Sequence, residues 1–175
     1  MAVRNVVRYP ARALKGLAGP VGEIGARERA LAQDLVDSMY DAPGCVGLAA
    51  PQLGVPLRAF CLDVSVMKKP PEGNHGLLVL FDPEPVLTAG SDLKREGCMS
   101  VPDYTCDVRR ATEVVVRGTT PDGDARVVEA HGFEARALQH ELDHLDGLLI
   151  LDRVASARTD VFRRKRYAAK GDHLK

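Results

Sequence analysis

Residues 133–146 constrain the fold more than any other part of this chain. Their sequence, FEARALQHELDHLD, is typical of a helix, and Gly147 stands where a left-handed residue commonly follows a helix. Apolar residues and histidines follow two separate sides of this helix. The first side carries Leu138, Leu142, Leu145 and Leu149, and the second carries Phe133, Ala137, His140 and His144. We therefore expect a central helix that is covered by β-sheet.

The rest of the chain supplies candidate helices and strands around it. Leu31, Leu35 and Met39 recur every four residues between charged positions, which predicts an amphipathic helix over residues 26–39. A basic helix is predicted over residues 156–170. Apolar and β-branched residues predict strands at 57–64, 77–81, 85–88, 112–117 and 126–130, the last two joined by a turn at 121–124.

These elements predict an α+β fold in which mixed or antiparallel sheets surround the helix at 133–146, with an N-terminal and a C-terminal helix. The chain has 175 residues, which is long enough for one well-buried core and short for two domains. We therefore expect residues 1–175 to form a single domain.

The charge balance argues against partners that are recognised by the overall charge of the protein. Lys plus Arg and Asp plus Glu number 24 each, so no overall field favours DNA or a membrane surface. The four cysteines form no C-x-x-C pair, and the sequence has no apolar run of signal-peptide or membrane-spanning length. A cytoplasmic protein with no membrane contact and no direct DNA binding is predicted.

The motif H-E-x-x-H, residues 140–144, lies within the predicted central helix. Residues four apart share a helix face, so His140 and His144 can direct two imidazole nitrogens at one metal ion. Glu141 lies beside that ion without having to bind it. A carboxylate in this place can take a proton from water and return it to a leaving group.

A third ligand would decide between a structural and a catalytic site. Cys98 lies between Gly97, which permits a tight backbone, and a turn at 100–102, and Glu96 can hold a neighbouring group. A thiolate and two imidazoles leave the fourth tetrahedral position free for water, as in catalytic sites. Cys45, Cys61 and Cys106 are interpreted as small buried apolar residues.

Three ordered segments resemble the motifs of the peptide deformylases: VGLAAPQ at 46–52, EGCMS at 96–100 and HELDHLDG at 140–147. Weaker family features are YP at 9–10 and FDP at 81–83, so the resemblance covers nearly the whole chain. It implies removal of the formyl group from the N-formyl-methionine of nascent polypeptides, with release of formate. It also implies an Fe²⁺ cofactor, for which Zn²⁺, Ni²⁺ or Co²⁺ can substitute.

The same resemblance assigns roles to individual residues. The metal ligands are Cys98, His140 and His144. Glu141 is the acid/base, and the Gln52 side chain and the Met99 backbone N–H stabilise the oxyanion. Gly47 pairs with the peptide main chain, and an arginine, Arg110, holds Glu96. Val46, Phe133 and Ala137 are candidates for the methionine pocket, although ordinary core packing would explain them equally well.

The sequence departs from the family in several places. Cys45 stands where the family usually has glycine, and a cysteine fits there only if its φ is negative. Thr105 replaces an arginine that is common near the methionine pocket. Asp82 replaces the usual Asn. The basic run at 163–167 resembles a tail that contacts the ribosome in some deformylases, which makes the ribosome a further expected partner.

Two other classes of function share parts of this pattern. A zincin-type peptidase contains H-E-x-x-H but needs a further ligand downstream, and it would leave Cys98 and Gln52 without a role. A non-catalytic metal-binding or ribosome-binding module would keep the ligands and lose Glu141 or Gln52. Both residues are present, which favours the enzyme.

Overall fold

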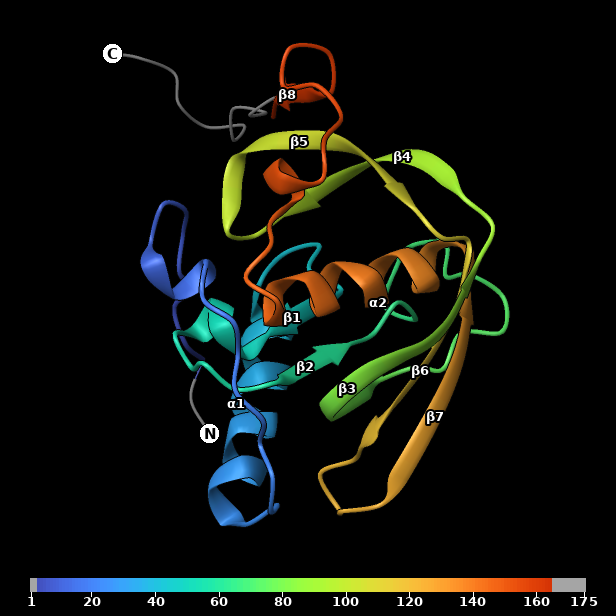
Figure 1. The fold of residues 1–175 in the computed structure, drawn as a ribbon. Coiled ribbons are helices and arrows are strands. Elements are labelled where there is room, and N and C mark those ends of the chain that lie inside the picture. Colours follow the sequence, from blue (N-terminus) through green and yellow to red (C-terminus); the bar gives the residue numbers. More distant parts are fainter. Residues whose placement is uncertain (1–2, 165–175) are drawn as a thin grey trace.

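The computed structural model describes residues 3–164, which form two α-helices and two antiparallel sheets (Figure 1). The strands of the five-stranded sheet lie in the order β1-β2-β3-β6-β7, and those of the three-stranded sheet in the order β4-β5-β8. The first sheet consists of β1 (Gly47–Ala49), β2 (Ala59–Leu62), β3 (Leu78–Ala89), β6 (Glu113–Thr119) and β7 (Ala125–His131). The second consists of β4 (Asp92–Cys98), β5 (Val101–Arg110) and β8 (Val161–Arg163).

Helix α2 (Gly132–Leu145) lies at the centre, between the five-stranded sheet and the β4–β5 hairpin (Figure 1). Leu138 and Leu145 are fully buried against the five-stranded sheet, and each such leucine stabilises the fold by about 1.5–3 kcal/mol. Gly147 has a φ of 71°, as a residue following a helix end requires. The expectation of a central, sheet-covered helix is confirmed.

The two faces of strand β2 separate two hydrophobic clusters. Phe60 and Leu62 face the cluster that contains the α2 leucines, whereas Ala59 and Cys61 face helix α1 (Ala26–Asp41), because successive side chains alternate across a strand. The α1 residues in this second cluster are those of the four-residue repeat, Leu31, Leu35 and Met39. Helix α1, the five-stranded sheet and helix α2 thus form three consecutive layers.

A third cluster supports the β4–β5 hairpin beside the motif region. Short 3₁₀ turns flank it: η1 (Arg12–Leu14) and η3 (Ile150–Asp152) contribute to the cluster, and η2 (Ala50–Leu53) follows β1. The buried members of the cluster are Leu14, Cys98, Val101, Cys106, Val108, Leu149 and Ile150. The hairpin that carries Cys98 is therefore anchored by its own core.

The strands at 77–81 and 85–88 are parts of one strand, β3, with register irregularities on either side of Glu84. Asp82 is the only described non-glycine residue with a positive φ, 46°, a region that aspartate tolerates better than most residues. Its carboxylate accepts hydrogen bonds from the backbone N–H groups of Val21 (2.7 Å) and Gly22 (3.0 Å). Asp82 thus fastens the N-terminal segment to the sheet.

The predicted C-terminal helix at 156–170 is wrong for its described part. Residues 157–159 form a turn, and Val161–Arg163 pair with the edge of β5 as strand β8. Backbone hydrogen bonds from Asp107 to Asp160 and from Arg164 to Asp103, both 2.8 Å, extend this pairing. Because Val161 and Phe162 favour strands and β5 offers an open edge, sheet pairing prevails there over helix. Residues 165–170 lie outside the described part.

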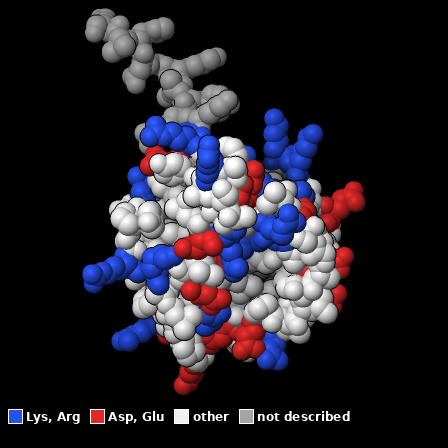
Figure 2. Space-filling model, turned by 45° about the horizontal axis from the view of Figure 1, so that its top comes forward, with Lys and Arg blue, Asp and Glu red and all other residues white. Residues whose placement is uncertain are grey.

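Surface charge follows the balanced composition. Basic and acidic side chains are interspersed over the face drawn in Figure 2, with neither sign dominating it. Within residues 3–164, neither helix is long and apolar enough to cross a bilayer.

Candidate metal centre and active site

Cys98, at the end of β4, meets the two histidines of α2. Its sulfur lies 3.3 Å from Nε2 of His144, and the candidate ligand atoms of all three residues lie within 4.8 Å of one another. The sulfur and the His144 ring are almost completely buried. Imidazoles on adjacent turns, 5.0 Å apart between ring centroids, converge with the thiol on one point. Among residues 3–164, this is the group of side chains able to hold a metal ion.

The pKa values of the two histidines are shifted in opposite directions. Burial by itself lowers the pKa of His140, but neighbouring Cys98 and Glu96 raise that pKa well above its ordinary value. Burial and the adjacent His140 lower the pKa of His144 well below its ordinary value. The donor set fits a metal ion.

Glu96 orients His140 from the side away from the sulfur. Its carboxylate lies 3.0 Å from Nδ1 of His140, which leaves Nε2 of that ring for the metal. Arg110 donates to both carboxylate oxygens, at 2.9 and 3.0 Å, so the predicted Glu96–Arg110 pair is present. Although burial opposes it, hydrogen bonds with His140 and Arg110 lower the pKa of Glu96 to about 2.

Three further charged residues belong to this network and were not identified in the sequence analysis. Arg136 donates to Glu96 at 2.7 Å, and Asp143 accepts a 2.5 Å hydrogen bond from Arg110 and is also paired with Arg153. Arg136 and Asp143 are buried on α2. Their position beside the histidines on a buried helix was the available signal, because buried charges require partners.

Gln52, in η2, directs its amide group at the metal cluster. The backbone N–H of Ala49 donates to its Oε1 at 2.9 Å, and its Nε2 lies 3.1 Å from Ser100 Oγ and 3.9 Å from the Cys98 sulfur. Because the oxygen is held by the backbone, the NH₂ group faces the site. Ser100, fully buried, is a contact that the sequence did not reveal.

Glu141 projects from α2 towards strand β1. Burial raises the pKa of its carboxyl group to about 7, and its Oε2 is buried without a hydrogen-bond partner in the described structure. A side chain at Gly47 would overlap with this carboxyl group, which explains the glycine at that position. A carboxyl group that titrates near neutrality beside a metal-binding cluster is suited to proton transfer.

Comparison with known proteins agrees with this geometry. Residues 3–160 match the family model described as polypeptide deformylase. The chain belongs to this family. A peptide deformylase of Thermodesulfovibrio yellowstonii is 40% identical over 165 residues, which cover 94% of this chain and 97% of the relative.

Solved structures give the same result. A Legionella pneumophila peptide deformylase superimposes with a TM-score of 0.80 at 37% identity, covering 88% of this chain and 87% of the other. A class I type b peptide deformylase of Acinetobacter baumannii, solved with Met-Ala-Ser bound, has a TM-score of 0.81 at 31% identity and coverages of 87% and 99%. The chain is a peptide deformylase, a metallohydrolase, which excludes the zincin and non-catalytic alternatives.

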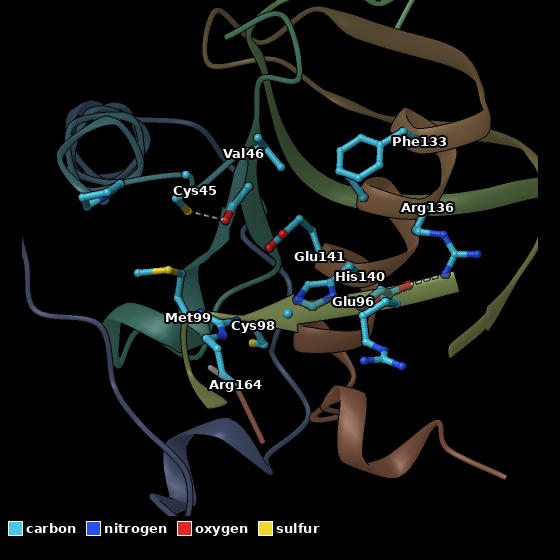
Figure 3. A pocket seen from close by; sticks show the side chains of 16 residues that line it. Cys45, Val46, Glu96, Cys98, Met99, Phe133, Arg136, His140, Glu141 and Arg164 are labelled. Carbon is cyan, nitrogen blue, oxygen red and sulfur yellow. Dashed lines mark hydrogen bonds and ion pairs between the residues drawn. The ribbon is translucent and has the colours of Figure 1, made fainter. Parts of the chain in front are cut away.

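The active-site cavity of this deformylase has a volume of about 260 Å³ (Figure 3). One wall comes from residues 43–47, the opposite wall from residues 95–99, and the floor from the first turns of α2 and its histidine face. Val46, Phe133 and Ala137 all line it, as does Met99. Phe133 is 40% exposed at the rim, so a bound side chain could cover it.

The departures from the family pattern lie around the same cavity. Cys45 has no positive φ, and its thiol donates to the Gly47 carbonyl oxygen at 3.1 Å. Burial, the largest cause, and nearby Glu141 raise the pKa of this thiol to about 12, so it remains protonated as a donor. Thr105 is paired with Gly97 on β4, and the guanidinium group of Arg164 lies over Gly97.

Proposed function

We propose that this deformylase acts on the N-formyl-methionyl end of nascent polypeptides, with Glu141 as its acid/base. The observation that carries the proposal is the buried, unpartnered Glu141 carboxyl group beside Cys98, His140 and His144. Hydrolysis of the formyl amide requires a group that first accepts a proton and then donates one. A carboxyl group with a pKa near 7 populates both forms at neutral pH.

Two free strand edges are suited to hold an extended peptide. In the described part of the chain, β1 and β4 are both edge strands, and both border the cavity. An extended peptide can add to such edges through main-chain hydrogen bonds, with Gly47 as the pairing residue on β1. The Met-Ala-Ser bound to the Acinetobacter relative supports a peptide ligand in this cavity.

The side chain of the first residue needs an apolar recess. We propose that Val46, Phe133 and Ala137 form it, since all three line the cavity and none places a charge there. An unbranched thioether adapts well to such a surface.

Gln52 and Met99 are proposed to stabilise the oxyanion. The Gln52 amide is fixed with its NH₂ group towards the cluster by Ala49 and Ser100. An amide donor favours a developing negative charge, and its fixed orientation avoids reorganisation during the reaction. The backbone N–H of Met99, next to Cys98 in the hairpin turn, is the second proposed donor.

The metal that Cys98, His140 and His144 would hold is proposed to be Fe²⁺. When bound, the ion would act as a Lewis acid towards water and the formyl carbonyl group. Thiolate and imidazole also accept Zn²⁺, Ni²⁺ and Co²⁺, so the choice of iron rests on the family resemblance. Iron content after anaerobic purification, and loss of activity of the iron form in air, would test it. An iron form that survives aeration unchanged would contradict it.

The setting of the reaction is proposed on the same basis. We propose that residues 1–175 act as one catalytic domain in the cytoplasm, where nascent chains emerge. The ribosome is a proposed partner through the basic residues that follow β8. Deletion of residues 165–175 should lower co-sedimentation with ribosomes and leave peptide turnover unchanged, and the reverse result would reject this partner.

The decisive experiment measures formate release from a formyl-methionyl peptide under anaerobic conditions. Metal-loaded wild type should be active, and Glu141→Gln should lose about 10²–10⁴-fold in kcat, because general acid–base catalysis contributes that much. Equal metal content in both proteins is the control. No release by wild type, or equal release by both proteins, would reject the proposal.

A further inference from the structure

We infer that Arg164 is a specificity-determining residue that favours peptides with a carboxylate side chain shortly after the formylated residue. This inference rests on the proposed function, since it names a substrate class for the same cavity. It depends on three observations: where β8 directs Arg164, what the guanidinium group contacts, and which charges around the cavity are already paired.

Strand pairing directs Arg164 to the cavity. Phe162 is paired with Thr105, and Thr105 with Gly97, so these three residues lie on one face of the three-stranded sheet. Arg164 follows Phe162 by two positions and therefore shares that face, whereas Arg163 points to the other face. Figure 3 shows Arg164 entering the cavity from below, on the side of Cys98 and Met99.

The guanidinium group of Arg164 lies directly over the Cα atom of Gly97. A Cβ atom at position 97 would overlap with it, and the next nearest neighbour is the short side chain of Thr105. Because Gly97 belongs to the free edge of β4, a peptide added to that edge would pass beside this guanidinium group. Arg164 thereby places a positive charge close to position 105, where this chain has the uncharged Thr105.

The other charged residues of the two nearby walls are already paired. Arg95 forms a 2.5 Å ion pair with Asp107 and lies 3.4 Å from the centre of the Phe162 ring. Arg136 is paired with Glu96 and Asp92. Within residues 3–164, no carboxylate pairs with Arg164. Its charge is therefore the one on these walls that is available to a ligand.

A carboxylate is the natural ligand for a free guanidinium group, which can donate to both oxygens. Arg164 is exposed, so water and salt screen the attraction. Exposed ion pairs of this kind change an equilibrium by about two- to fivefold. The expected preference is therefore modest, sensitive to salt, and expressed mainly in KM.

The test compares pairs of formyl-methionyl tripeptide amides that differ only by Glu or Gln, placed at the second or at the third residue. Blocking the C-terminus as an amide removes the terminal carboxylate as a competing ligand. Wild type, Arg164→Gln and Arg163→Gln are assayed for kcat/KM by formate release at low and at high salt. Arg163→Gln removes the same charge from the opposite face of β8 and is the matched control.

The expected result is a Glu-over-Gln preference of about two- to fivefold at one of the two positions in wild type and in Arg163→Gln. Arg164→Gln should abolish it, and high salt should reduce it. The inference is overturned if wild type has no preference at either position, if Arg164→Gln keeps it, or if both variants lose it equally. Absence of formate release from all four peptides would instead reject the proposed function.

Discussion

The two sides of helix α2 are buried by different means. The leucine side packs against side chains of the five-stranded sheet, where any apolar residue of suitable volume would fill the space. The histidine side carries Arg136, His140 and Asp143, which pair with Glu96 of β4 or Arg110 of β5. An apolar contact thus tolerates the exchange of one apolar residue for another of similar volume, whereas a buried charge depends on individual hydrogen bonds.

This difference explains where the metal ligands lie. His140 is oriented by Glu96, and Glu96 is held by two arginines from different elements. Such a network fixes a ring within a narrow range of positions, as metal binding demands. The leucine side contributes only the stable platform. Substitutions on the two sides should therefore separate stability from metal binding.

The largest effect is expected from Arg110→Ala on the charged side. The change removes a cation shared by Glu96 and Asp143, and breaking a buried ion pair costs about 3–5 kcal/mol. The free energy of unfolding in urea measures this loss, and metal content or turnover should fall with it. Unchanged metal content and kinetics would show that the network is not required for the site.

Leu138→Ala tests the apolar side. Leu138 is fully buried, so its truncation should lower the free energy of unfolding by about 2–5 kcal/mol. Metal affinity and kcat of the protein that remains folded should equal those of wild type. A drop in metal affinity as large as that of the charged-side variants would contradict the separation of the two sides.

Glu96→Gln should reduce metal affinity as well as stability, because Glu96 also pairs with Arg110 and Arg136. The amide retains the volume but weakens the contact that orients His140, and changes of this kind reduce metal affinity about 10–100-fold. Competition with a chelator measures it. If the variant retained wild-type affinity, Glu96 would be shown to stabilise its arginines and not the metal site.

The smallest effect is expected where a buried carboxylate is paired with hydroxyl groups and not with arginines. Burial by itself raises the pKa of Asp63, but hydrogen bonds from Ser65 and Tyr40 outweigh this effect and lower the pKa below its ordinary value. The associated stability is therefore present above about pH 4 and is lost as the pH falls through the lower folded pKa.

Tyr40→Phe removes one of these donors, a 2.5 Å hydrogen bond to Asp63. The expected loss is about 1–2 kcal/mol at pH 7, shrinking towards acid pH as the carboxylate is protonated. Urea unfolding at pH 7 and at pH 3 measures both values. A loss that is equal at the two pH values would mean that the contribution of the hydroxyl group does not depend on the charge of Asp63.

Much of the fold could be predicted from periodicity. The helices at 26–39 and 133–146 and the hairpin of β6 and β7 agree with their patterns, because apolar spacing reports burial directly. Strand β4, with the sequence DLKREGC, has no such pattern, because most of its residues are exposed and the buried Glu96 is charged. Strand β8 is too short to be recognised locally, and pairing with β5 determines it.

The candidate site divides in the same way. His140, Glu141, His144, Cys98 and Gln52 could be assembled from motif spacing and family resemblance, and the structure brings them together. Arg136, Asp143 and Ser100 could not, because their partners lie far away in sequence. The position of Arg164 depends on two successive strand pairings, β8 with β5 and β5 with β4, neither of which is visible in the order of residues.

The sequence by itself determined the central helix, its ligand spacing and the chemical class of the enzyme, because these depend on residues a few positions apart or on motifs in a constant order. Tertiary structure alone decided which charges are paired and which remain available. Charge pairing is set by contacts across tens of residues, and its energy depends on burial, which only the folded chain defines.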